Sequence, residues 1–185
     1  MKKGEKRRWQ LLSVALDEFI AKGFYGTSTR EIAKNAKISS GLLFHYFENK
    51  EAIYEELVKI GTEKMKIDVQ TALMAPREYL EHMLKSTFEL LDTNTFFAKM
   101  FVFIDDAQYV VVENKEIRKM LDENDICTQW VPVIEEGQRR GEFRDGNPHA
   151  LCVALFGALQ GIAQEKVRVP ETPMPEVMWI MDIIK

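Results

Sequence analysis

Cysteine and histidine are scarce in this chain, which has two cysteines and three histidines among 185 residues. Cys127 and Cys152 lie in apolar helical patterns, with neither a CxxC spacing nor a nearby pair of histidines. A structural zinc site needs roughly four such ligands at close spacing, and a disulfide framework needs several cysteines. We therefore interpret both cysteines as ordinary thiols and expect no bound metal and no cofactor.

Groupings of polar residues typical of catalysis are also missing. Asp105 and Asp106 are paired carboxylates in sequence, but adjacent residues on a helix point about 100° apart. No nucleophile or metal-ligand spacing accompanies them. The sequence therefore does not support an enzyme, and we expect no catalytic residues.

Long apolar runs are absent, because no stretch comes near the roughly 20 residues that cross a bilayer. The first residues are rich in Lys and Arg and run into an amphipathic helix rather than into the apolar region of a secretory signal. We expect a cytoplasmic protein that does not associate with a membrane.

Positive charge is concentrated at the N-terminal end of an acidic chain. Residues 1–50 carry ten Lys and Arg against five Asp and Glu, or about +5, which leaves about −9 of the total of −4 for the remainder. A basic module on an acidic body favours nucleic-acid binding at one end. The cluster from Lys2 to Arg8 has two interpretations, an arm that meets phosphate or the minor groove, or a solubilising tail.

Three short helices are predicted in the basic region. Apolar residues at i, i+3, i+4 and i+7 from Leu12 to Phe19 predict a helix over about 6–22, which Gly23 ends. Ser28 and Glu31 have the spacing of a capping box, which predicts a helix to about residue 35. After a three-residue turn, a serine caps a third helix that ends near residue 47. This is the helix-turn-helix arrangement.

The rest of the chain is also predicted to be helical. The expected helices cover about 51–73, 76–92, 94–111, 117–140 with a kink at Pro132, 148–168, and a last one ending near Lys185. Residues 109–112 (YVVV) form the one strongly β-prone stretch, and we interpret it as a helix end. The predicted fold is all-α, with a helix-turn-helix domain over 1–50 and a helical regulatory and dimerisation domain over 51–185.

Two segments carry a resemblance to a known family. Residues 23–33 (GFYGTSTREIA) and 39–51 (SSGLLFHYFENKE) resemble the signature of the TetR family of repressors, over nearly all of residues 8–55. Residues 136–144 (EGQRRGEFR) resemble the family's link into its dimerisation helices. The resemblance implies an all-helical homodimer that recognises operator DNA in the major groove and releases it when a small ligand binds.

The same residues suit DNA on physical grounds. Hydroxyls and amides at a helix N-terminus suit a phosphate, and residues on the third helix suit the groove floor. In particular, Arg30 has the geometry to read guanine, and Leu42 to pack on a thymine methyl. The predicted DNA-binding residues are Thr27, Ser28, Thr29, Arg30, Ser39, Ser40, Gly41, Leu42, His45, Tyr46 and Lys50.

Three positions depart from the usual family pattern. Lys37 stands where glycine is usual, so a positive φ there would cost on the order of 1 kcal/mol. Phe44 replaces a tyrosine and has no hydroxyl for phosphate, and Leu42 replaces a threonine. We expect Leu43, Phe44 and Phe47 to be core residues, whereas His45 is either a DNA contact or a solvated side chain.

Methionine and phenylalanine are concentrated between residues 65 and 130. The family resemblance makes this region the ligand domain, and such a lining favours an apolar or aromatic effector, although the same residues also suit a plain core. The acidic residues Glu89, Asp105, Asp106 and Glu113 also leave room for a cationic effector. The predicted ligand-binding residues are Phe97, Met100, Phe101 and Trp130.

Small residues recur four apart on the helix that begins at Pro148, a spacing that lets two backbones approach closely. With the apolar last helix, they predict a symmetric four-helix interface between two copies. The predicted interface residues are Leu151, Ala154, Leu155, Gly157, Ala158, Gly161, Ile162, Ile180 and Ile184.

Two functions remain at this point. The first is a repressor that a small ligand releases from a palindromic operator. The second is a nucleoid or division factor on the same helix-turn-helix scaffold, whose C-terminal domain binds a protein partner. A ligand cavity favours the first, and a solid core with an exposed apolar patch favours the second.

Overall fold

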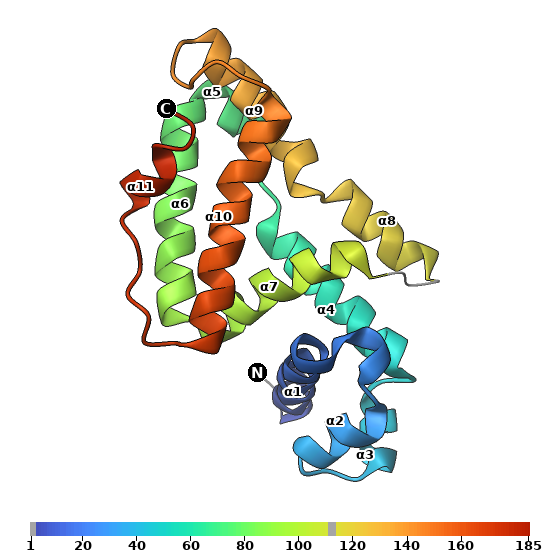
Figure 1. Cartoon of the computed structure of the whole chain (residues 1–185). Coiled ribbons are helices and arrows are strands. Elements are labelled where there is room, and N and C mark those ends of the chain that lie inside the picture. Colours follow the sequence, from blue (N-terminus) through green and yellow to red (C-terminus); the bar gives the residue numbers. More distant parts are fainter. Residues whose placement is uncertain (1–2, 111–113) are drawn as a thin grey trace. The chain divides into compact units, whose positions relative to one another are not determined.

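The computed structural model describes residues 3–110 and 114–185, and every regular element in these two segments is a helix. The all-α prediction is confirmed (Figure 1). The helices are α1 (Lys3–Gly26), α2 (Thr29–Asn35), α3 (Ser40–Tyr46), α4 (Lys50–Met65), α5 (Val69–Met74), α6 (Pro76–Thr93), α7 (Thr95–Tyr109), α8 (Lys115–Glu123), α9 (Ile126–Arg139), α10 (Pro148–Arg168) and α11 (Val177–Met181).

The chain divides into two compact units. Unit 1 combines Met1–Lys64 with Lys99–Leu121, and unit 2 combines Met65–Ala98 with Asp122–Lys185. Unit 1 therefore holds α1 to α3 together with nearly all of α4 and most of α7 and α8. The functional boundary predicted after residue 50 is a different property, and it stays a prediction.

Two long helices predicted from periodicity are each interrupted in the structure. The predicted helix over 51–73 is broken before α5, where the carboxylate of Asp68 accepts a hydrogen bond from the amide three residues later. The predicted helix over 117–140 is broken before α9, where Asp125 caps the new helix in the same way. Each aspartate satisfies an orphan amide at a helix start, which favours a fresh helix over continuation. Helix α9 runs on through Pro132.

Two helix ends also differ from expectation. The predicted C-terminal helix is only the five-residue α11, and turns follow it to the end of the chain. Helix α7 ends at Tyr109, as expected for the β-prone stretch, and Val111 and Val112 lie outside the described residues.

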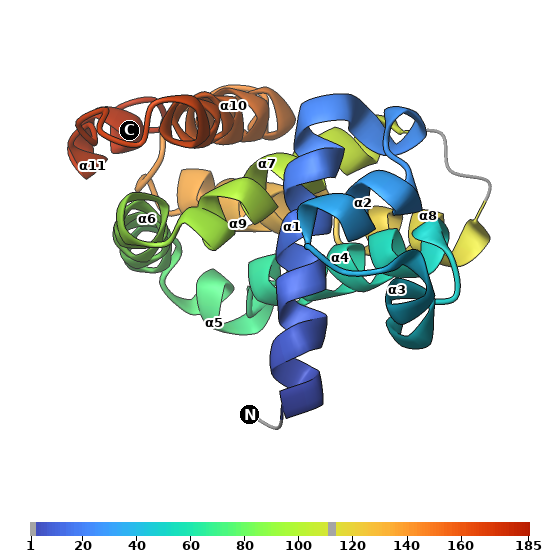
Figure 2. The ribbon, with the colours of Figure 1, turned by 90° about the horizontal axis from the view of Figure 1, so that it is seen from below.

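Aromatic rings and a close helix contact make the core of unit 1. Tyr54 on α4 packs edge-on against Phe19 at 5.1 Å and against Phe103 at 5.0 Å between ring centroids. Gly61 lets α4 meet α7, because a Cβ there would lie only 2.4 Å from Cγ1 of Ile104. This core supports α2, which packs on both α1 and α3 (Figure 2).

Helices α6, α9, α10 and α11 pack together in unit 2. Trp130 on α9 is 1% exposed, with its ring 6.0 Å from Tyr79 and 5.6 Å from Phe156. The buried ammonium of Lys166 donates to Asp92 at 2.8 Å and to two carbonyls of the segment that follows α10. These bonds attach that segment, which leads to α11, to the rest of the unit.

Helix α10 corrects one expectation about apolar runs. By length and composition it is long and apolar enough to cross a membrane, yet only 33% of its apolar stretch is buried within the chain. Length and composition alone do not separate a membrane span from a helix whose apolar face meets a protein partner.

Candidate nucleic-acid interface

The start of α2 is fixed by the predicted capping box, which the structure confirms. The hydroxyl oxygen of Ser28 accepts a hydrogen bond from the amide of Glu31 at 3.3 Å. Lys22 donates to Glu31 at 2.8 Å and to Glu18 at 2.7 Å. The hydrogen bond from Lys22 holds the pKa of Glu31 below its ordinary value. Helix α2 is therefore attached to α1 at its first turn.

Thr27 lies at the same place but does not present its hydroxyl to solvent. Its side chain is buried, and the hydroxyl donates to the carbonyls of Glu18 at 3.0 Å and Gly23 at 2.8 Å. Gly23 itself has a φ of 71°, which is the predicted helix break. Of the three predicted DNA-binding residues at 27–29, Thr27 could contact DNA only through its backbone. Ser28 is exposed, and Thr29 is partly exposed.

The turn between α2 and α3 has the predicted strained residue. Lys37 has a φ of 55°, in the left-handed region that favours glycine. The next amide, that of Ile38, donates to the carbonyl of Ala33 at 3.0 Å and closes the turn. The chain therefore carries a local strain inside its helix-turn-helix.

Replacing Lys37 by glycine should raise the free energy of unfolding by up to about 1 kcal/mol, because the Cβ strain disappears. Urea denaturation measures the change. The matched control is Lys34→Gly, an exposed site within α2, which should lower the free energy of unfolding by about 1 kcal/mol. A loss of stability in the Lys37 variant would show that the turn is not strained.

Helix α3 is anchored on one side and open on the other. Leu43 and Phe47 are buried, as predicted. The hydroxyl oxygen of Ser39 accepts a hydrogen bond from the amide of Leu42 at 3.2 Å and begins the helix. The exposed residues of α3 are Ser40, Gly41, Leu42, Phe44 and His45.

Phe44 is not the core residue that the sequence predicted, since it is 50% exposed. Leu43 and Phe47 are four apart and share one face, and a helix turns about 100° per residue, so Phe44 points away from that face. Leu42 is also 39% exposed. The open side of α3 therefore carries two large apolar side chains.

Lys50 and Arg8 stabilise this region through contacts within the chain. The ammonium of Lys50 donates to the carbonyls of Phe24 at 2.7 Å and Thr27 at 3.0 Å. The guanidinium of Arg8 pairs with Glu56, donates to the carbonyl of Tyr46 at 2.6 Å, and lies over a ring at the end of α3. The sequence could not show these partners. The predicted DNA contact of Lys50 stays a prediction.

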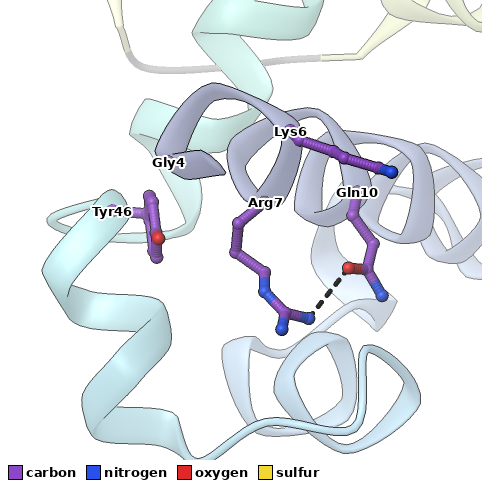
Figure 3. A pocket seen from close by; sticks show the side chains of 5 residues that line it. All are labelled: Gly4, Lys6, Arg7, Gln10 and Tyr46. Atoms are coloured by element: carbon purple, nitrogen blue, oxygen red, sulfur yellow. Dashed lines mark hydrogen bonds between the residues drawn. The ribbon is translucent and has the colours of Figure 1, made fainter. Parts of the chain in front are cut away.

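A groove of about 540 Å³ lies between the first turns of α1 and the end of α3. Its lining residues are Gly4, Lys6, Arg7, Gln10 and Tyr46. Figure 3 shows Tyr46 across the groove from Arg7 and Gln10, which are joined by a 2.8 Å hydrogen bond. Two cations, a phenol and an amide make the groove rich in donors, which suits an anion. Lys2 and the side chain of Lys3 lie outside the described part of the chain.

The four predicted ligand-binding residues are divided between the two units. Met100 and Phe101 belong to unit 1, whereas Phe97 and Trp130 belong to unit 2. Met100 and Trp130 are buried, and the other two are partly buried. The four do not lie together within one unit, so the predicted effector site stays a proposal.

The acidic residues near these positions differ in their surroundings. Burial raises the pKa of the carboxyl of Asp105 and also that of Asp106. Glu113 lies outside the described residues, and Glu89 is exposed on α6.

The predicted dimer residues differ in how free they are to meet a partner. Leu155, Ile180 and Ile184 are buried in the core of unit 2. Leu151, Ala158 and Ile162 are partly buried. The exposed members are Ala154, Gly157 and Gly161. Two apolar residues that were not predicted, Val153 on α10 and Trp179 on α11, are also exposed.

Residues 11–57 match the family described as bacterial regulatory proteins, tetR family. The chain is also 31% identical over 153 residues to the HTH-type transcriptional repressor KstR2 of Mycolicibacterium smegmatis, covering 75% of this chain and 68% of that protein. The chain belongs to the TetR family. The sequence-based resemblance is thereby confirmed.

Two solved structures share the fold of the chain. The ketosteroid transcriptional regulator KstR2 of Mycobacterium tuberculosis aligns with a TM-score of 0.70 and 23% identity, covering 95% of this chain and 90% of that one. AibR in complex with isovaleryl coenzyme A and operator DNA aligns with a TM-score of 0.68 and 17% identity, covering 95% and 94%. The fold of both structures thus extends over nearly the whole length of this chain.

Proposed function

We propose that this TetR-family chain is a DNA-binding transcriptional repressor that grips a palindromic operator as a homodimer. The observation that carries the proposal is the open side of α3, where five consecutive or near-consecutive residues face solvent while Leu43 and Phe47 fix the helix from beneath. The repressor name of the KstR2 relative and the operator DNA bound to AibR support the same function.

Base contacts are proposed for α3 and for one residue of α2. Arg30 is exposed, and its guanidinium has the fork that pairs with guanine. Ser40 and His45 offer polar groups, and Leu42 offers apolar contact with a thymine methyl. Phe44 joins this set, because its exposed ring suits the same kind of apolar contact.

Phosphate contacts are proposed for the groove at the end of α3. Lys6 and Arg7 supply positive charge, and the hydroxyl of Tyr46 is a further donor across the groove (Figure 3). Of the two interpretations of the N-terminal basic cluster, the groove favours the phosphate contact. Arg8 is excluded from this role by its internal ion pair with Glu56.

Removing these phosphate contacts should weaken binding to any DNA sequence and reduce its salt dependence. In a dimer each substitution acts twice, so Lys6→Ala or Arg7→Ala should lower the magnitude of the log–log salt slope by about 2. Fluorescence anisotropy with a duplex of arbitrary sequence, between 50 and 200 mM salt as a rough range, measures the slope. The control Lys85→Ala removes the same charge from α6 and should leave the slope unchanged.

An unchanged slope in both groove variants would exclude the groove as a phosphate site. An equal fall in the Lys85→Ala control would instead show that the slope follows net charge rather than a contact at the groove.

The exposed small residues of α10 are proposed to form the dimer interface together with the exposed part of α11. About two-thirds of the apolar stretch of α10 is not buried within the chain. A Cβ added at Gly157 or at Gly161 would have no atom of a neighbouring element within 4 Å. A second copy of the same face would cover this surface with closely spaced backbones.

We propose that a small apolar or aromatic effector releases the operator. Phe97, Met100, Phe101 and Trp130 are the proposed contacts. One of the similar structures, AibR, is a complex with isovaleryl coenzyme A, a small molecule that carries an apolar acyl group, and this supports a small-molecule effector. A thermal-shift screen paired with operator binding tests this step, and ligands that stabilise the protein without releasing DNA would contradict it.

A further inference from the structure

The two cysteines of the chain meet in unit 2. Cys127 is partly buried in the first turn of α9, and Cys152 is buried in α10, 25 positions later in sequence. Both thiols are free, and their side chains lie close enough to interact with each other. Helices α9 and α10 pack against each other, so the contact joins two elements of one compact unit.

The surroundings of the pair restrict its chemistry. Among residues 3–110 and 114–185, no group of three or more His, Cys, Asp or Glu is placed to hold a metal ion. Burial raises the pKa of both thiols, and the carboxylate of Asp125 raises them further. Two neighbouring thiols on packed helices, one of them partly exposed, are the arrangement that a disulfide between the helices needs.

We propose that Cys127 and Cys152 form a reversible disulfide that an oxidant of the peroxide or diazenedicarboxamide class closes between α9 and α10. With hydrogen peroxide, the sulfur of Cys127 attacks the peroxide oxygen and becomes a sulfenic acid, and water leaves. The sulfur of Cys152 then displaces the second water. Two thiols and one peroxide thus give one disulfide and two waters, and the two electrons pass from sulfur to oxygen.

The disulfide would form slowly, and its main effect would be to stabilise the folded protein. Because both thiols are held protonated, closure should be slower than at a low-pKa thiol. The closed loop of about 25 residues restricts the unfolded chain, so the oxidised protein should melt about 5 to 10 °C above the reduced one. The bond would hold α10, which carries the proposed dimer face, firmly on α9.

The test uses the purified full chain treated with diamide, the diazenedicarboxamide reagent, and then with dithiothreitol. We expect an intact mass lower by two hydrogens, loss of both free thiols, faster migration on a non-reducing gel and the higher melting temperature, all reversed by the reductant. Cys127→Ser and Cys152→Ala, as single variants, should show none of these changes.

Equilibration with glutathione supplies a measurement that does not depend on rate. The disulfide should be favoured on the order of 100-fold more strongly in the native chain than in the urea-unfolded chain, since the bond and the fold stabilise each other. Equal preference in the two states would overturn the proposal. So would oxidation that yields only disulfides between chains, or a disulfide that leaves the melting temperature unchanged.

Discussion

Replacing Gly157 by leucine should convert the protein from a dimer to a monomer and lower its operator affinity by at least about 100-fold. The leucine side chain would stand between two α10 helices that must approach closely, and so would the side chain in Gly161→Leu. A monomer holds only one half-site, and it loses the advantage of the second attachment, which is worth about 100- to 10,000-fold. Sedimentation velocity and operator titration measure the two effects.

This experiment separates assembly from folding. A Cβ at Gly157 would have no atom of the neighbouring elements within 4 Å, so a side chain can begin there without a clash against the rest of its own chain. Glycine within a helix costs about 1 kcal/mol relative to better helix formers, so the monomer should be at least as stable as the wild-type protomer. The control Glu89→Leu adds the same side chain to an exposed site on α6 and should remain dimeric. A Gly157→Leu variant that stays dimeric would contradict the proposed interface.

Replacing Arg30 by alanine should lower operator affinity by about 5- to 150-fold for each half-site and relax sequence preference at one guanine of each half-site. Arg30 is exposed on α2, the helix that packs on α3, so its loss removes a base contact without opening the core. Anisotropy titrations of the wild type and the variant use the operator and versions with each guanine replaced. They measure whether the loss of Arg30 and the replacement of each guanine have additive effects on affinity.

The expected result is non-additivity at a single position. Once Arg30 is gone, changing its guanine should cost nothing further, whereas changes elsewhere should cost the same as before. The control Arg168→Ala removes a comparable charge from the end of α10 and should leave every titration unchanged. Equal weakening on all sequences would show that Arg30 contacts phosphate instead.

The sequence predicted features that depend on neighbours along the chain. The capping box of Ser28 and Glu31 and the break at Gly23 each follow from a few consecutive residues, whereas the positive φ of Lys37 was expected from the family resemblance. The buried pair Leu43 and Phe47 follows from helical spacing.

Features that depend on distant partners were not accessible in the same way. The sequence placed Arg8 in a basic arm or tail and Lys50 among the predicted DNA contacts. In the structure Arg8 pairs with Glu56, 48 positions away, and Lys50 donates to the carbonyl of Phe24, 26 positions away, so both make internal contacts. Periodicity also continued smoothly across Asp68 and Asp125, so the new helix starts were hidden by the apolar pattern on either side.

The assignment of α10 shows a further limit of periodicity. Leu155 and Gly157 both belong to an apolar helix, but one is buried within the chain and the other is exposed. An apolar pattern on several faces predicts that the helix is buried. It does not show which face is buried within the chain and which is left for a partner. Only the packing of α10 on α6, α9 and α11 separates the two.

Selection of bound duplexes from a pool of random DNA by the purified chain tests the central claim most directly. A symmetric dimer should enrich a palindrome whose two half-sites are centred about one helical turn apart, roughly 34 to 36 Å. The combined variant Arg30→Ala and Ser40→Ala should shift or lose that preference. Enrichment of no sequence, or of one that these substitutions leave unchanged, would contradict operator recognition by α2 and α3.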